Sequence, residues 1–170
     1  TATNTQERAN ELLSYMASQK TMLSDKLADV EPESVYLAGN SSLLSTAGPA
    51  MYQSSMIELA GGNYALDDAQ TASTSGSSVT LEMERFYATA KDADIIVYNG
   101  TIDESVATLN DFVGKNALLS QFKAVKNGNV WVTSADMYQQ MTSTADIIDE
   151  LHGAFTGDDA SNFHYLRKLG

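Results

Sequence analysis

The 170-residue sequence contains no cysteine. Thiolate metal sites, thiol catalysis and disulfide crosslinks are therefore excluded. A chain of this length buries roughly 70% of its unfolded surface, so it needs no crosslink to fold as one domain. Proline is also scarce: Pro32 ends the first expected helix, and Pro49 stands at the first position of another.

Basic residues are few, with 10 Lys and Arg against 22 Asp and Glu, and the formal net charge is −12. Such a field repels nucleic acids and anionic membrane surfaces, so we expect no nucleic-acid partner. No apolar run approaches the ~20 residues of a membrane helix. The chain opens with polar residues and shows no signal-peptide pattern, which indicates either a cytoplasmic protein or a chain whose leader has been removed.

Several sequence motifs of enzymes and nucleotide-binding proteins are absent as well. The chain has no glycine-rich dinucleotide motif, no phosphate-binding P-loop and no nucleophile elbow. Both histidines, His152 and His164, lie near the C-terminus, and we interpret Asp149 with His152 as a solvated pair rather than a catalytic dyad. Zinc and manganese would lack their usual cluster of His and carboxylate ligands. We therefore expect a binding protein without metal or cofactor, and not an enzyme.

What the sequence does contain is a regular alternation of strands and helices. Continuous apolar runs predict strands that are buried on both faces, and apolar residues at helical spacing predict helices. The alternation predicts an α/β fold, with a mostly parallel sheet, helices on both faces and one long helix in front. The expected strands cover residues 34–38, 63–66, 95–98 and 130–133; the expected helices cover 6–30, 49–60, 80–90, 101–112, 116–125 and 143–155; residues 158–170 form a tail.

Capping residues predict where four of these helices begin. Thr80, Asn116 and Ser143 each precede an apolar periodic stretch, where a side-chain oxygen can accept a hydrogen bond from a free first-turn amide. Residues 101–104 match a capping box. We therefore expect helices to start at these four places.

The first helix, over residues 6–30, is unusually long. Roughly 25 residues make a rod of about 37 Å, which is longer than a compact domain of this size needs. We therefore expect part of its apolar stripe to face something other than the domain that follows.

Three stretches carry a resemblance to a known family. Residues 79–82 lead through a helix to residues 92–97, residues 56–63 form a helix that ends in a glycine pair, and residues 122–131 contain the turn A-V-K-N-G-N-V. Taken in order and at their separations, they resemble the solute-binding proteins of ABC importers for iron-siderophores, haem and cobalamin.

The resemblance implies a particular organisation of the chain. Members of that family have two α/β lobes joined by one long helix, and the ligand lies between the lobes. Residues 1–32 would then be the inter-lobe helix and residues 33–170 the C-terminal lobe, while the N-terminal lobe would lie upstream of this chain. It also implies a monomer outside the cytoplasm, in the periplasm or lipid-anchored at the cell surface, that delivers its ligand to an ABC permease.

Site residues follow from the resemblance and from the carboxyl ends of the strands, where open sheets place their ligands. Glu82 fits the acidic residue with which the C-terminal lobe docks on the permease, with Glu84 as the second choice. An acid in a first helical turn also favours the helix dipole by ~0.3–1 kcal/mol, which is the alternative role for Glu82. The ligand-facing candidates are Asn40, Ser41, Tyr52, Asn99 and Tyr138.

The ligand class is suggested by where the arginines lie. Family members that take up anionic ferric catecholates tend to line the cleft with Arg and Lys. The expected strand-end loops are residues 39–45, 99–101 and 134–141. Arg8, Arg85 and Arg167 all lie outside these loops, and the loops contain no Lys. We therefore expect a neutral or weakly charged ligand: a ferric hydroxamate, haem or a corrinoid.

Two other hypotheses about the function remain open at this point. One is a self-contained flavodoxin-like domain that binds a phosphate-bearing cofactor through the Ser/Thr-rich residues 40–46. The long first helix counts against this reading, and so does the lack of a second anion-binding signal. The other is a structural or adaptor domain.

Overall fold

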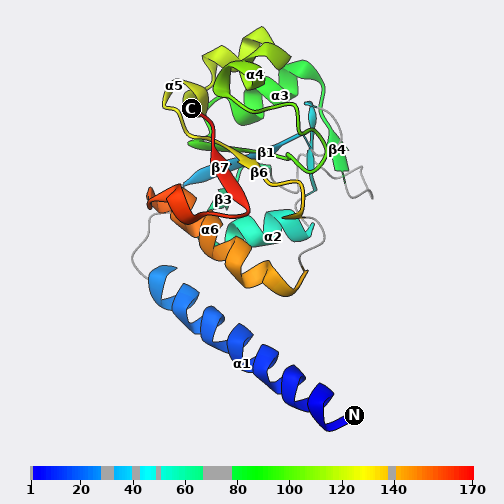
Figure 1. The fold of residues 1–170 in the computed structure, drawn as a ribbon. Helices are drawn as coiled ribbons and strands as arrows, with labels where there is room; N and C mark the ends of the chain where they lie inside the picture. Colours follow the sequence, from blue (N-terminus) through cyan, green and yellow to red (C-terminus); the bar gives the residue numbers. More distant parts are fainter. Residues whose placement is uncertain (1, 28–32, 40–42, 49–50, 67–77, 138–140) are drawn as a thin grey trace.

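The structure is a computed structural model, and it describes residues 2–27, 33–39, 43–48, 51–66, 78–137 and 141–170. A long helix stands off a layered α/β body (Figure 1). The strands are β1 (Ser34–Ala38), β2 (Ser45–Ala47), β3 (Asn63–Tyr64), β4 (Ser78–Thr80), β5 (Ile95–Tyr98), β6 (Val130–Thr133) and β7 (Leu166–Lys168). The α-helices are α1 (Ala2–Leu27), α2 (Tyr52–Leu59), α3 (Met83–Ala90), α4 (Leu109–Lys115), α5 (Lys123–Lys126) and α6 (Thr144–Thr156), and the 3-10 helices are η2 (Ala117–Gln121), η4 (Met141–Ser143) and η5 (Ala160–Asn162).

The main sheet has five strands in the order β3-β1-β5-β6-β7. The pairs β1/β3, β1/β5 and β5/β6 are parallel, and β6/β7 is antiparallel. The predicted fold class is therefore confirmed. The predicted tail over residues 158–170 is wrong in part, because it contains the edge strand β7.

Helices cover both faces of this sheet. In Figure 1, α3, α4 and α5 lie above it, and α2 and α6 lie below it. Tyr36 of β1 meets Phe86 of α3 edge to face, with the ring centroids 5.7 Å apart. On the other face, the α6 residues Ile147, Leu151 and Phe155 are buried. Because each face has its own apolar layer, β5 and β6 are buried along their whole length, as their continuous apolar runs predict.

A second, two-stranded sheet pairs β2 with β4 in antiparallel register. Thr80 pairs with Ser45 in this ribbon. The prediction that Thr80 caps a helix is therefore wrong, because its backbone is already extended and paired. The helix α3 starts at Met83, and Glu82 occupies the N-cap position without a capping side-chain hydrogen bond.

The predicted capping box at residues 101–104 is also wrong. The helix begins later, at Leu109, where Thr108 and Asp111 form a capping box: the Asp111 amide donates to Thr108 Oγ1 at 3.2 Å, and the Thr108 amide donates to Asp111 Oδ2 at 2.8 Å. Residues 101–102 and 104–105 are turns and no helix starts there, so residues 101–104 have no first helical turn for a box to cap.

Two other predicted helix starts are partly right. Asn116 accepts a hydrogen bond from the amide of Leu118 at 2.9 Å, but the helix it caps is the 3-10 helix η2. Ser143 stands at the N-cap of α6 without a capping hydrogen bond from its side chain. Pro49 lies outside the described residues, and α2 begins at Tyr52.

The helix α1 spans 26 residues, which corresponds to about 39 Å. It reaches the body through α6: the Tyr15 hydroxyl donates to Asp146, and Lys26 Nζ lies 2.5 Å from Asp149 Oδ1. Leu13 is 65% exposed, so α1 is not packed inside the domain. The predicted long helix is confirmed over its described part.

His152 corrects the interpretation of the Asp149/His152 pair as solvated. The His152 side chain is buried, and its Nδ1 lies 3.1 Å from the carbonyl oxygen of Ala60 at the end of α2. Asp149 turns instead toward Lys26. The histidine is thus part of the α2/α6 contact, and the carboxylate is part of the α1/α6 contact.

Candidate functional site

The carboxyl ends of the parallel strands form the edge at which this sheet type binds ligands. In the sheet, β1 lies between β3 and β5, so the chain runs from β1 to β3 on one side and later returns to β5 on the other. The order of the strands therefore reverses between β1 and β5. The residues that follow β1 and β5 are the first candidates for a site.

Two glycines allow the backbones to approach closely at this edge. Gly39, after β1, has φ +81°, and a Cβ there would lie 2.6 Å from Cε2 of Tyr98. A Cβ on Gly100, after β5, would lie 2.1 Å from the carbonyl oxygen of Thr133. The Gly100 amide also donates to Thr133 Oγ1 at 3.0 Å, which ties the end of β5 to the end of β6.

Asn99 shapes the turn after β5. It is 5% exposed, and its Oδ1 accepts hydrogen bonds from the Thr101 amide at 3.1 Å and from the Thr101 hydroxyl. Such a bond to the amide two residues on is the usual way in which Asn stabilises a turn. The Asn99 amide also donates to the carbonyl oxygen of Ala38 in β1 at 2.9 Å. Its expected contact with a ligand stays a prediction.

Asp103 is the centre of the longer loop from β5 to α4. Its carboxylate accepts from the Tyr98 hydroxyl at 2.9 Å, from Lys115 Nζ at 2.6 Å, and from the amide and hydroxyl of Ser105 at 3.0 and 2.6 Å. The bonds from Lys115 and Ser105 hold the pKa of the Asp103 carboxyl well below its ordinary value. Burial, followed by the bond to Asp103, raises the pKa of the Tyr98 hydroxyl. Sequence reasoning missed this cluster, although an Asp two residues before a Ser is a common turn signal.

The remaining predicted ligand residues have mixed outcomes. Tyr52 is the first residue of α2 and is 44% exposed, so it is available for contact. Asn40, Ser41 and Tyr138 lie outside the described residues. Their roles stay predictions.

Glu82 is exposed at the N-cap of α3. It follows the β2/β4 ribbon rather than standing in the first helical turn, because the helix starts three residues after Thr80. Its docking role stays a prediction, and Glu84 is the acid in the first turn.

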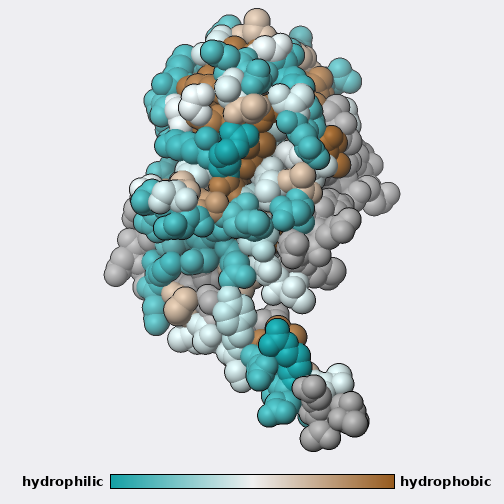
Figure 2. Space-filling model, in the orientation of Figure 1, coloured by the Kyte–Doolittle hydropathy of each residue, from teal (hydrophilic) through white to brown (hydrophobic). Residues whose placement is uncertain are grey.

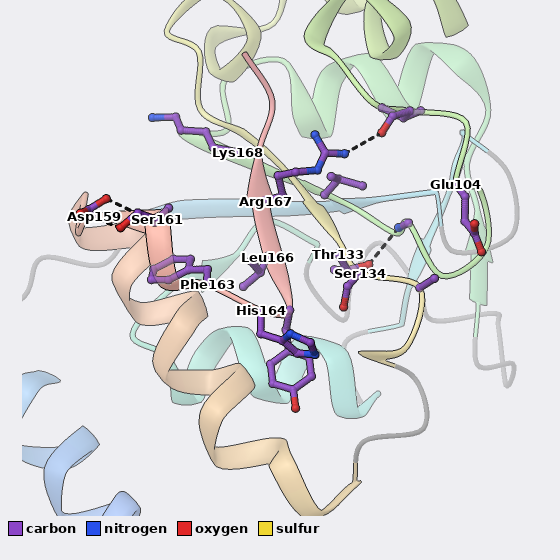
Figure 3. A pocket seen from close by; sticks show the side chains of 16 residues that line it. Glu104, Thr133, Ser134, Asp159, Ser161, Phe163, His164, Leu166, Arg167 and Lys168 are labelled. Carbon is purple, nitrogen blue, oxygen red and sulfur yellow. Dashed lines mark hydrogen bonds between the residues drawn. The ribbon is translucent and has the colours of Figure 1, made fainter.

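A cavity of about 720 Å³ lies beside β7 (Figure 3). Apolar side chains of Val106, Val132, Phe163 and Leu166 line it, and polar and charged ones complete the lining. The Arg167 guanidinium donates to the carbonyl oxygens of residues 106 and 107 at 3.3 and 2.6 Å. Of the predicted ligand residues that the structure describes, neither Tyr52 nor Asn99 lines this cavity, and the cavity meets the strand-end edge at Gly100, Thr133 and Ser134.

One carboxylate of α6 holds the segment that enters β7. Glu150 accepts hydrogen bonds from three successive amides, those of His164, Tyr165 and Leu166, at 2.8, 2.8 and 3.0 Å. The His164 ring has its own partner, since its Nε2 lies 3.2 Å from Asp136 Oδ2. The position of the cavity wall therefore depends on an acidic side chain from a helix, which strand periodicity does not reveal.

The strand-end loops contain no basic residue of their own, although Lys115 of α4 and Arg167 of β7 donate hydrogen bonds to residues 103–107. The sequence has no Lys or Arg between Lys26 and Arg85, and none in residues 99–108 or 134–143, whereas Asp103, Glu104 and Asp136 are acidic. The face drawn in Figure 2 is largely hydrophilic, with apolar surface showing in the upper part of the body. An anionic ligand would find no basic partner in these loops.

Other kinds of site find little support. Within the described residues, no group of three or more His, Cys, Asp or Glu side chains is arranged to hold a metal ion. The Ser/Thr-rich loop of the flavodoxin-like reading contains Ser45 and Thr46, and both are fully buried in β2. Thr46 Oγ1 lies 2.6 Å from the Tyr64 hydroxyl, so it faces the interior rather than a phosphate. Among the helices that the structure describes, none has both the length and the apolar content to cross a bilayer.

Solved structures with the same fold are longer than this chain. The TroA-like periplasmic binding protein FepB from Veillonella parvula superposes with a TM-score of 0.71 at 16% identity, over 96% of this chain and 57% of its own. The periplasmic heme-binding protein RhuT from Roseiflexus sp. RS-1 has a TM-score of 0.68 at 18% identity, over 89% and 56%. IsdE from S. aureus, solved with heme, has a TM-score of 0.67 at 19% identity, over 89% and 58%. The chain thus spans little more than half the length of these proteins.

Sequence comparison gives the family. A search of curated protein sequences finds no match. The family profile described as periplasmic binding protein matches residues 1–137, well over half of the chain. It covers the long helix, the ribbon and the parallel strands β1, β3, β5 and β6. The chain therefore belongs to the periplasmic binding protein family.

Proposed function

We propose that this chain is the C-terminal lobe, with its connecting helix, of the extracytoplasmic solute-binding component of an ABC importer. Residues 1–32 are the connecting helix and residues 33–170 the lobe. The observation that carries the proposal is α1, a 26-residue helix that leaves the body and exposes Leu13 and Met22 to solvent. A second lobe upstream would cover such residues, and the solved relatives have the length for one.

The ligand in this proposal is a ferric hydroxamate, haem or a corrinoid, held at the strand-end edge. Two of the similar structures carry heme in their descriptions, RhuT as a heme-binding protein and IsdE as a heme complex. The absence of Lys and Arg from residues 99–108 and 134–143 favours a neutral or weakly charged ligand over a strongly anionic one. Tyr52, the first residue of α2, is a described candidate whose side chain is 44% exposed.

The test compares this chain with a protein extended upstream by the second lobe. Both are titrated with haemin, cyanocobalamin and ferrioxamine B by calorimetry. We expect one of the three to bind the two-lobed protein with a sub-micromolar Kd, and to bind the single lobe at least about a hundredfold more weakly, because each ~1.4 kcal/mol of lost contact is a factor of ten. Equal sub-micromolar binding by residues 1–170 alone would contradict the two-lobe proposal.

The docking role proposed for Glu82 has a separate test, which measures uptake through the permease. An exposed rim charge acts mainly on the association rate and its salt dependence. The Glu82→Gln variant of the two-lobed protein should therefore bind its ligand as before and support slower uptake into vesicles that contain the permease. Glu84→Gln is tested beside it, because Glu84, in the first turn of the same helix, is the second choice for the docking residue. Normal uptake with Glu82→Gln would move the docking role elsewhere.

A further inference from the structure

The loop from β5 to α4 covers residues 99–108 and is held at both of its ends. Tyr98 closes β5 and Lys115 closes α4, and both donate to the carboxylate of Asp103, at 2.9 and 2.6 Å. Lys115 Nζ also donates to Ser105 Oγ at 2.8 Å. A connection of ten residues without helix or strand usually has conformational freedom. Here one carboxylate joins the strand before it, the helix after it and the middle of the loop.

The first turn of this loop is fixed separately. Asn99 Oδ1 accepts from the Thr101 amide at 3.1 Å, and the Ile102 amide donates to the Asn99 carbonyl oxygen at 3.4 Å. Ile102 therefore stands between two anchored residues, Thr101 and Asp103. Its backbone position is defined by the loop and not by packing of its own side chain.

The side chain of Ile102 is 54% exposed, although it is a large branched aliphatic group. A single exposed apolar residue is ordinary on a protein surface. Ile102 differs in its place: it follows β5 at the point where the strand order reverses, which is where sheets of this type bind ligands. The neighbouring loop residues Asp103 and Glu104 are acidic, so they do not attract an anionic group. The favourable contact that this turn offers to a ligand is therefore the apolar one of Ile102.

We infer that Asp103 is a positioning residue that holds Ile102 toward the bound ligand, and that the part of the ligand meeting this loop is apolar. The inference rests on the proposed function, since it takes the strand-end edge as the ligand side. It adds a named contact and a chemical character for that part of the ligand. The edge of a macrocycle or a hydrocarbon segment of a chelator fits, and a carboxylate or catecholate group does not.

The binding test uses the two-lobed protein and the probe among haemin, cyanocobalamin and ferrioxamine B that the wild type binds. Ile102→Ser should weaken binding about tenfold, as expected for the loss of a buried aliphatic contact. Leu59→Ser is the matched control: Leu59 is also an exposed apolar residue, 58% exposed, and it lies at the far end of α2. Unchanged affinity in Ile102→Ser, or equal loss in both variants, would overturn the contact.

The positioning role needs a readout that a general loss of stability would not produce. Asp103→Asn should also weaken binding, and the double variant with Ile102→Ser should bind no more weakly than Ile102→Ser alone, because the two residues would act through one contact. Independent, additive losses would show that Asp103 acts in some other way and would overturn its assignment as a positioning residue.

Hydrogen exchange of the unliganded protein separates this inference from the proposed function. Asp103→Asn should speed the exchange of amides in residues 100–107 by about tenfold or more while leaving β5 and β6 protected. Unchanged exchange would overturn the anchoring of the loop by Asp103. If the wild type binds none of the three probes, the proposed function fails and the ligand contact fails with it, and the exchange result still decides whether Asp103 anchors the loop.

Discussion

The two longest helices of the molecule, α1 and α6, have different relations to the body. α6 buries seven of its residues against the sheet and α2, and ends at Gly157, whose φ of +81° stops the helix. α1 is twice as long, yet the side-chain contacts described between it and the body are polar ones on the surface of α6. The comparison teaches that helix length does not say where a helix is held, since the shorter and more apolar helix is the buried one. The presence of a partner surface decides this.

The largest expected effect concerns the apolar packing of α6, compared with the exposed apolar residues of α1. Leu151 of α6 is buried, so Leu151→Ala should lower the free energy of unfolding by about 2–5 kcal/mol, through lost transfer energy and the cavity it leaves. Leu13→Ala makes the same change on α1, where the side chain is 65% exposed, and should change stability by no more than about 0.5 kcal/mol. Urea denaturation of both variants checks this, and similar losses would show that α1 is packed after all.

A smaller effect is expected from the polar contact that α6 makes with β7. Glu150→Ala removes the acceptor of three backbone amides and should cost about 1.5–3 kcal/mol, the range for hydrogen bonds to a charged group. Glu150→Gln is the control, since it keeps one acceptor oxygen and should lose less. Exchange of the amides in β7 should rise together with the loss of stability. A stable Glu150→Ala variant with protected β7 amides would show that the strand holds itself.

Lowering the pH tests how much Asp103, in the polar loop after β5, contributes to stability. Because the pKa of Asp103 is lowered in the folded protein, its contribution is complete above its unfolded pKa of about 3.9 and is lost as the pH falls through the folded value. Both Asp103 and Lys115 are 31% exposed, so the contribution is about 1 kcal/mol after screening. Stability curves from pH 6 to pH 2 should therefore be less steep below pH 4 for Asp103→Asn than for the wild type. Parallel curves would exclude this contribution.

The smallest expected effect concerns the attachment of α1. Lys26 and Asp149 are 42% and 39% exposed, so Lys26→Ala should change the free energy of unfolding by less than about 1 kcal/mol, and less still at high salt. Limited proteolysis should nevertheless cut α1 faster, because the helix would lose one of the polar contacts described between it and α6. Arg8→Ala is the matched control, as Arg8 pairs with Glu11 inside α1 and does not reach the body. Equal cleavage of both variants would contradict the role of the Lys26 contact.

Much of the candidate edge could be predicted because it follows from the order of strands. The runs 35–38, 95–98 and 130–132 are apolar throughout, and the structure places them in the adjacent parallel strands β1, β5 and β6. Their carboxyl ends then had to lie together. The side-chain contacts at this edge could not be predicted from the order of the strands. The sequence pointed to Asn99, whereas Asp103 and Ile102 emerged only with the tertiary contacts of Tyr98 and Lys115.

The sequence by itself determined the fold class, the three central strands, the long first helix and the absence of basic residues from the strand-end loops, because each depends on local periodicity or composition. Only the tertiary structure decided that Thr80 pairs in a ribbon, that His152 is buried against Ala60, and that residues 166–168 form an edge strand. Each of these depends on a partner far away in the chain. A short segment alone does not specify such a partner, because most of its stabilisation comes from packing against the surface that it meets.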